Sequence, residues 1–150
     1  MGGLNTRSTC DDVLMPISTG FNHVATLSTD LDRHADFYAR VFGAEVTFRM
    51  DAKDDHPRMF ILDLGGGASL NVFEVTPDEI IGERRKMGGR GAIDHYAIAV
   101  ESLGVLEEAK QRLIDAGADI GEIQRLGNEW SLFFRDVDGM ELEVCAPADD

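Results

Sequence analysis

The sequence predicts an α+β fold made of two βαβββ modules, and three observations lead to that prediction. The chain has 150 residues, which suits one domain. Shifting the chain by 72 residues lays 22–25 on 94–97 and 67–72 on 139–144, so it contains an internal repeat. Each copy has one segment with helical periodicity followed by three extended segments. We expect the modules to form a cup-shaped, partly open mixed sheet with helices on its outer face.

Each module begins with an extended segment, at 21–27 and at 94–100, and continues with a helix. Apolar residues recur at helical spacing in both copies, and each helix is predicted to end at a glycine, Gly43 or Gly117, where a left-handed cap costs no Cβ clash. The three later segments are predicted at 45–51, 58–64 and 69–75, and at 119–125, 130–135 and 141–146. The Asp138-Gly139 pair indicates a hairpin turn.

These elements divide the chain into four parts. Residues 1–19 are an N-terminal arm rich in Gly, Ser, Thr and Asp, 20–76 the first module, 77–91 a linker, and 92–147 the second module. The arm has no basic start followed by an apolar stretch, so it is not predicted to be a signal peptide.

Composition narrows the range of partners and compartments. The formal charge is −14, with 28 acidic and 14 basic residues, and such a chain repels phosphate backbones and anionic lipid. We therefore expect a small-molecule partner, no nucleic acid and no membrane. Cys10 and Cys145 provide no disulfide framework, so a cytoplasmic location is predicted.

Two histidines occupy equivalent places in the repeat. His23 and His95 lie on the first strand of each module, and 48 residues after each come Asn71 and Glu143 on the last strand. Side chains alternate between the faces of a strand, so Asn71 and Glu143 are predicted to point away from the helices, into the cup. The alternative is that each histidine is an ordinary half-buried strand residue with a hydrogen-bond partner.

Two histidines and one carboxylate form a ligand set for a divalent metal. The set His23, His95 and Glu143 suits Fe(II), Mn, Ni, Co or Zn and leaves positions open for substrate or water. Asn71 is either a weak fourth ligand or a residue that holds a water. By strand parity Glu141 and Phe73 face the same way, while Tyr96 is expected in core packing.

The sequence resembles the vicinal oxygen chelate superfamily, the glyoxalase, bleomycin-resistance and extradiol dioxygenase group. The matching stretches are FNHVATLSTDLDRHADFYARVFGAEV, GAIDHYAIAV and LFFRDVDGMELEV, within 20–147. The resemblance implies paired βαβββ modules around a divalent metal held by His23, His95 and Glu143. Asn71 takes the place of a Glu or Gln in glyoxalase I and methylmalonyl-CoA epimerase, a departure that counts against glyoxalase I itself.

The resemblance implies a metal-dependent enzyme acting on a small oxygen-chelating substrate by dioxygenase, lyase, isomerase or transferase chemistry. Glu143 and Glu141 are the candidate catalytic carboxylates, Glu141 otherwise being a rim carboxylate. Asn71, Phe73 and Arg135 are the candidate substrate-binding residues, although Arg135 has Asp136 and Asp138 as alternative partners.

The alternative function is that of a metal-free protein that sequesters a drug or metabolite, as the bleomycin-resistance relatives do. We expect a homodimer, with the modules paired either within one chain or between two. Two other histidines are given no site role: His34 is expected in solvent on a helix, and His56 in a charged loop, where it or Arg58 could still touch substrate.

Overall fold

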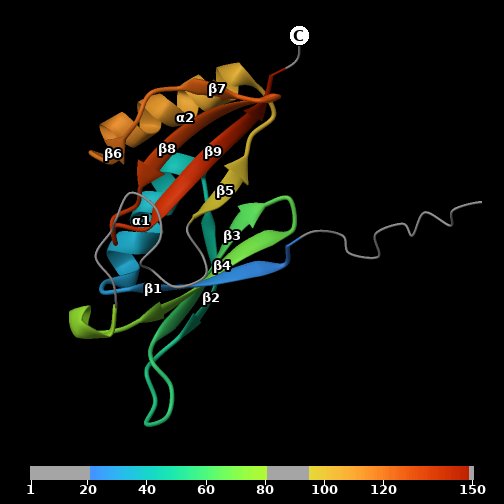
Figure 1. Cartoon of the computed structure of the whole chain (residues 1–150). Helices are drawn as coiled ribbons and strands as arrows, with labels where there is room; N and C mark the ends of the chain where they lie inside the picture. Colours follow the sequence, from blue (N-terminus) through green and yellow to red (C-terminus); the bar gives the residue numbers. More distant parts are fainter. Residues whose placement is uncertain (1–20, 81–94, 149–150) are drawn as a thin grey trace, which may run out of the picture.

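The computed structural model describes residues 21–80 and 95–148 of the chain. The first module contains β1 (His23–Ser28), α1 (Leu31–Phe42), β2 (Glu45–Met50), β3 (Met59–Gly65), β4 (Ala68–Glu74) and a short 3-10 helix, η1 (Pro77–Glu79). The second contains β5 (Tyr96–Ala99), α2 (Leu103–Asp115), β6 (Asp119–Ile120), β7 (Gln124–Leu126), β8 (Glu129–Arg135) and β9 (Glu141–Pro147) (Figure 1). The predicted arm and residues 81–91 of the predicted linker lie outside the described residues.

The strands form two open mixed sheets, one for each module. The first has the order β1-β4-β3-β2 and the second the order β5-β9-β8-β6, with β7 also paired to β8. In each sheet the first and last strands of the module are parallel, and the other pairs are antiparallel. The predicted α+β fold of two βαβββ modules is confirmed.

One predicted strand differs from the structure. The segment 119–125 is divided into β6 and β7, because the chain leaves the edge of β8 between them. Gly121 still donates its N–H to the Phe133 carbonyl at 2.8 Å, but the next pairing to β8 begins only at Gln124.

Capping residues mark the ends of both helices; α1 ends at Gly43 as predicted, whereas α2 has Ala116 as its C-cap, directly before the predicted Gly117. The Asp30 side chain accepts a hydrogen bond from the Arg33 N–H at the start of α1, and Ser102 does the same for Val105 at the start of α2. Gly43 closes α1 in the left-handed region, with φ of 69°. The apolar stripe of α1 is buried, which fixes the helix on its sheet.

Alternation along the strands gives each sheet a helix-facing side and an opposite side. On β9 Leu142 and Val144 are buried, while Glu141, Glu143 and Cys145 are partly exposed. On β4 Leu70 and Val72 are buried, while Asn71 and Phe73 are partly exposed. The predicted orientation of the last strands is therefore confirmed.

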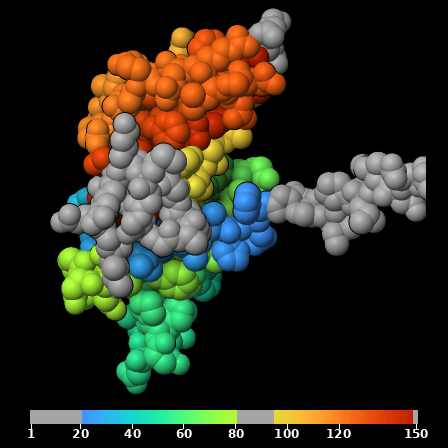
Figure 2. All heavy atoms as spheres, viewed as in Figure 1, coloured from blue at the N-terminus to red at the C-terminus, as the bar shows by residue number. Residues whose placement is uncertain are grey.

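The two modules share one hydrophobic core around α1 and α2, which contact each other. Phe134 on β8 lies with its ring centroid 6.5 Å from that of Phe37 and 5.7 Å from that of Phe42, both on α1. The modules adjoin in Figure 2, where the first is blue and green and the second orange and red. Within the described ranges no helix is long and apolar enough to cross a membrane.

Candidate metal centre

The second module brings two of the predicted ligands together. Glu143 lies in the middle of β9, opposite Ala97 on β5 and Phe133 on β8, and His95 directly precedes β5. The distance from His95 Nε2 to Glu143 Oε2 is 3.3 Å, with 33% and 12% of the two side chains exposed. An imidazole nitrogen and a carboxylate oxygen therefore meet on the face of the sheet away from α2.

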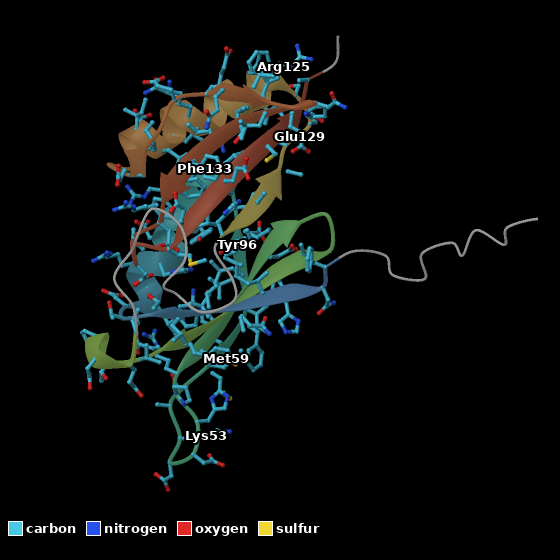
Figure 3. All side chains as sticks on the ribbon, in the orientation of Figure 1. Lys53, Met59, Tyr96, Arg125, Glu129 and Phe133 are labelled. Atoms are coloured by element: carbon cyan, nitrogen blue, oxygen red, sulfur yellow. The ribbon has the colours of Figure 1, made fainter. Side chains whose placement is uncertain are left out.

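Neighbouring side chains fix the position of this pair. Ser131 on β8 is fully buried, and its hydroxyl donates a hydrogen bond to Glu143 Oε1. The rings of Phe133 and His95 pack edge to face, with 5.2 Å between centroids. Phe133 extends from β8 (Figure 3). Tyr96 has the opposite parity and packs against the core, as predicted, with burial raising its pKa.

The first module holds the other two predicted residues on the corresponding face. His23 begins β1, is exposed, and has Nδ1 at 2.8 Å from the Asn22 side-chain oxygen. Since Nδ1 contacts Asn22, Nε2 is the ring nitrogen that a ligand role would use. Asn71 lies opposite Ala25 and Ile61 and is half-buried.

His23 does not join His95 and Glu143 within one chain. Among the described residues, the group of three His, Cys, Asp or Glu side chains with ligand atoms all within 4.8 Å of one another consists of His34, Asp136 and Asp138. A three-ligand centre with His23 therefore needs the His23 face of another molecule or a movement between modules, and this assignment remains a prediction.

The other predicted substrate-binding residues lie on the same two faces. Arg135 is opposite Glu141 in the register of β8 and β9, and its Nη1 lies 3.4 Å from the Asp119 carboxylate. That ion pair replaces the expected alternatives Asp136 and Asp138, because β6 runs beside β8 at this point. In the first module the rings of Phe73 and His56 lie 5.7 Å apart.

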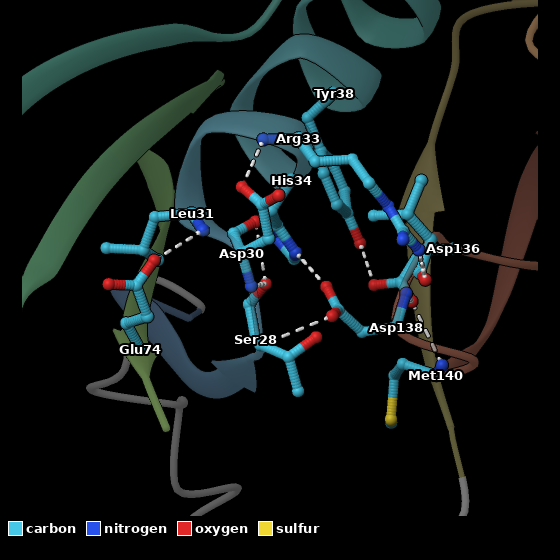
Figure 4. Close-up of polar contacts among 12 residues, drawn as sticks. Ser28, Asp30, Leu31, Arg33, His34, Tyr38, Glu74, Asp136, Asp138 and Met140 are labelled. Carbon is cyan, nitrogen blue, oxygen red and sulfur yellow. Dashed lines mark hydrogen bonds and ion pairs between the residues drawn. The ribbon is translucent and has the colours of Figure 1, made fainter. Parts of the chain in front are cut away.

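His34 is not in solvent, and that expectation is wrong. Its side chain is fully buried, because α1 packs against the turn between β8 and β9. His34 Nδ1 lies 2.8 Å from Asp138 Oδ2, while its Nε2 is buried without a hydrogen-bond partner (Figure 4). The sequence indicated this turn only through its Asp-Gly pair. No sequence signal indicated that the turn would contact a helix more than a hundred residues earlier in the chain.

Tyr38 makes a second contact from α1 to this turn. Its hydroxyl donates to Asp136 Oδ2 at 3.0 Å, and the backbone N–H groups of Asp138 and Met140 donate to Asp136 Oδ1 at 2.9 and 3.0 Å. Burial raises the pKa of Asp136. We call the four side chains the inter-module joint: His34, Tyr38, Asp136 and Asp138.

The joint includes the three-residue group that could hold a metal, but its carboxylate oxygens already accept hydrogen bonds. Asp138 Oδ1 accepts the Thr29 N–H at 3.2 Å, and Asp138 Oδ2 faces His34. Burial raises the pKa of Asp138, but the hydrogen bonds with His34 and its other partners outweigh that effect and lower it overall. A cation here would have to displace these donors, so the arrangement suits a hydrogen-bonded connection between modules.

The glyoxalase/bleomycin resistance protein/dioxygenase superfamily matches residues 20–144. The chain belongs to this superfamily. A superfamily structure from Frankia sp. EAN1pec, a glyoxylase/bleomycin resistance protein/dioxygenase domain, is 28% identical and superimposes with a TM-score of 0.74. The match covers 87% of this chain and 98% of that one.

Two curated superfamily relatives carry names that specify reactions. The chain is 25% identical over 127 residues to the putative ring-cleaving dioxygenase MhqA of Bacillus subtilis (strain 168), covering 85% of this chain and 40% of the relative. It is 29% identical over 104 residues to the mitochondrial methylmalonyl-CoA epimerase of Bos taurus, covering 67% of this chain and 59% of the relative. The chain thus spans about half the length of these relatives.

A solved structure with lower sequence identity to this chain contains a metal. The fosfomycin resistance protein FosX from Listeria monocytogenes, solved as a mutant complexed with Mn(II) and 1S,2S-dihydroxypropylphosphonic acid, is 17% identical with a TM-score of 0.64. The match covers 89% of this chain and 93% of that chain, and at this identity it demonstrates the shared fold alone.

Proposed function

We propose that the protein is a divalent-metal-dependent enzyme acting on a small substrate with adjacent oxygens, and that His23, His95 and Glu143 hold the metal. The observation that carries the proposal is the 3.3 Å approach of His95 Nε2 to Glu143 Oε2 on the open face of the second sheet. Ligand atoms about 2.0–2.2 Å from one metal lie about 3 Å from each other, so this pair fits two positions of one coordination sphere. The set suits Fe, Mn, Ni, Co or Zn.

His23 is proposed to come from a second copy of the chain in a homodimer. The face of the first sheet that carries His23 is open, with Leu27 43% and Phe48 47% exposed. A partner chain that covered this face would bury both side chains. Pairing this face with the Glu143 face of a partner would complete two equivalent sites by two-fold symmetry.

Each residue around the metal has a proposed part in the chemistry. A bound cation would hold two substrate oxygens and stabilise negative charge that develops on them. Glu141 shares the face of Glu143 and is proposed to accept a proton from the bound substrate at a carboxylate oxygen. Asn71 is proposed to orient the substrate through its amide, Phe73 to exclude water, and Arg135 to bind an anionic substrate group.

Metal analysis of the full chain, purified without chelator or nickel affinity, tests the ligand set. The wild type is expected to hold or take up about one divalent ion per chain, and His95→Ala and Glu143→Gln are expected to lose it. His56→Ala is the matched control, because His56 lies beside Phe73 without being a proposed ligand. Retention of metal by both ligand variants would contradict the assignment.

The identity of the metal then selects the reaction to assay. Fe(II) would direct assays toward ring-opening oxygenation, as in the name of the MhqA relative. Mn, Co, Ni or Zn would direct them toward proton transfer, lyase or transferase chemistry, with the epimerase relative as the example for proton transfer.

Mixing two variants tests the shared site. In a homodimer of either variant, His23→Ala or Glu143→Gln, both sites lack one ligand. In a mixed dimer, one site takes His23 from one chain and Glu143 from the other, and both residues are intact there. Random exchange should restore metal binding to about a quarter of the sites, since half of the dimers are mixed and each has one intact site of two. Sites formed within one chain would give no restoration.

A second candidate function is a metal-free protein that sequesters a ligand. The formal charge of −14 favours it, because an acidic protein attracts a cationic drug or metabolite. A wild type that contains no metal and takes up none would favour this function over the enzyme.

A further inference from the structure

The two modules differ in the residues that surround Glu143 on β9 and Asn71 on β4. Glu143 in the second module corresponds to Asn71 in the first, at a shift of 72 residues. The strand pair next to Glu143 places Ser131 opposite Cys145. The pair next to Asn71 places Met59 opposite Phe73 instead. Polar hydrogen-bonding side chains therefore accompany the carboxylate, and apolar ones accompany the amide.

The Ser131 side chain is directed at the Glu143 carboxylate. The Ser131 hydroxyl donates to Glu143 Oε1, and Ser131 is fully buried, so water does not compete for this bond. His95 stands on the other side, 3.3 Å from Oε2. The two carboxylate oxygens thus have different surroundings: Oε1 meets the hydroxyl, and Oε2 meets the imidazole.

We propose that Ser131 is a positioning residue that fixes the Glu143 carboxylate so that Oε2 alone binds the metal. The inference rests on the proposed function and specifies which atom of Glu143 is the ligand. The hydrogen bond restrains rotation of the carboxylate and occupies one lone pair of Oε1, so it favours binding of a cation through Oε2 alone. Partners outside the ligand set orient ligands in this way, and their loss weakens metal binding about 10–100-fold.

Manganese titration of the full chain tests the proposal, with free Mn²⁺ followed by electron paramagnetic resonance. Ser131→Ala removes the hydroxyl, and Ser131→Thr retains one. Ser28→Ala is the matched control, because Ser28 is also fully buried and its hydroxyl donates to the Asp30 carbonyl at 3.0 Å, in the first module. Urea denaturation of each variant establishes that it is folded before its affinity is compared.

The expected result is a Kd for Mn²⁺ about ten-fold higher in Ser131→Ala, with Ser28→Ala within two-fold of the wild type and Ser131→Thr closer to the wild type than Ser131→Ala. An infrared difference spectrum gives a second readout. The carboxylate bands that disappear in Glu143→Gln should be widely split on Mn²⁺ addition to the wild type, and less split in Ser131→Ala, where both oxygens are free to bind.

Two results would overturn the inference while leaving the proposed function intact. One is Ser131→Ala binding Mn²⁺ as tightly as the wild type. The other is Ser28→Ala losing affinity equally, since that would assign the effect to general destabilisation. If the wild type binds no divalent ion, the proposed function is wrong, and the inference about Ser131 is wrong with it. Failure of the proposed function is therefore distinguishable from failure of the inference alone.

Discussion

Replacing Tyr38 by phenylalanine should lower the free energy of unfolding by about 2 kcal/mol. The change removes a single hydroxyl, whose hydrogen bond to Asp136 Oδ2 is 3.0 Å long and buried between α1 and the turn before β9. A hydrogen bond to a charged group contributes about 1.5–3 kcal/mol. Asp136 Oδ1 keeps its two backbone donors, so the loss is limited to one bond. The ring is retained, and no large cavity forms.

Urea denaturation followed by circular dichroism at pH 7 measures this loss, and the midpoint of thermal unfolding should fall by about 4–8 °C. Tyr96→Phe is the matched control, because the Tyr96 hydroxyl lies 3.5 Å from that of Tyr38, at the outer limit of a hydrogen bond. The control should cost less than about 1 kcal/mol. Equal losses in both variants, or no loss in Tyr38→Phe, would refute the role assigned to the inter-module joint.

Two further predictions concern pH and backbone conformation. The lowered pKa of Asp138 means that its ionised form stabilises the fold above the ordinary carboxyl pKa and that this stability is lost as pH falls through the lowered value. Asp138→Asn should therefore reduce the urea midpoint at pH 7 and make the midpoint fall less steeply toward pH 3. An unchanged fall with pH would contradict the role assigned to Asp138. The pKa of Asp136 is raised, so ionisation of Asp136 has the opposite effect on stability. Gly43→Ala should cost about 1–2 kcal/mol in a urea titration, since a Cβ there meets no atom within 4 Å and the whole cost is the left-handed backbone, with φ of 69°. Gly104→Ala in α2, where φ is not positive, should be neutral or stabilising by about 0.5–1 kcal/mol, and a loss there as large as at Gly43 would refute the conformational explanation.

The repeat made the fold predictable from sequence. Local signals marked each element twice, so the β-α-β-β-β order and the orientation of Glu143 and Asn71 could be derived from periodicity and strand parity alone. The same signals failed at the division between β6 and β7, because hydrophobic alternation does not show where an edge strand leaves its neighbour.

Periodicity and strand parity did not predict the contacts between segments that are distant in sequence. His34 has acidic neighbours in sequence and was expected in solvent, but its burial depends on a turn 104 residues later. Ser131 carried no motif, and its contact with Glu143 follows only from the register that places it opposite Cys145. Sequence periodicity identifies the face of a strand, whereas registry between strands decides which side chains meet on it.

The inter-module joint also has a consequence for the order of folding during synthesis. Its first half, on α1, leaves the ribosome about a hundred residues before its second half. Until the turn at 136–139 emerges, the buried His34 and Tyr38 side chains lack the Asp138 and Asp136 carboxylates that they contact in the finished protein. Contacts of such long sequence separation form late, because a large loop must close first. We therefore expect the first module to complete its packing only after the β8–β9 hairpin has been synthesised.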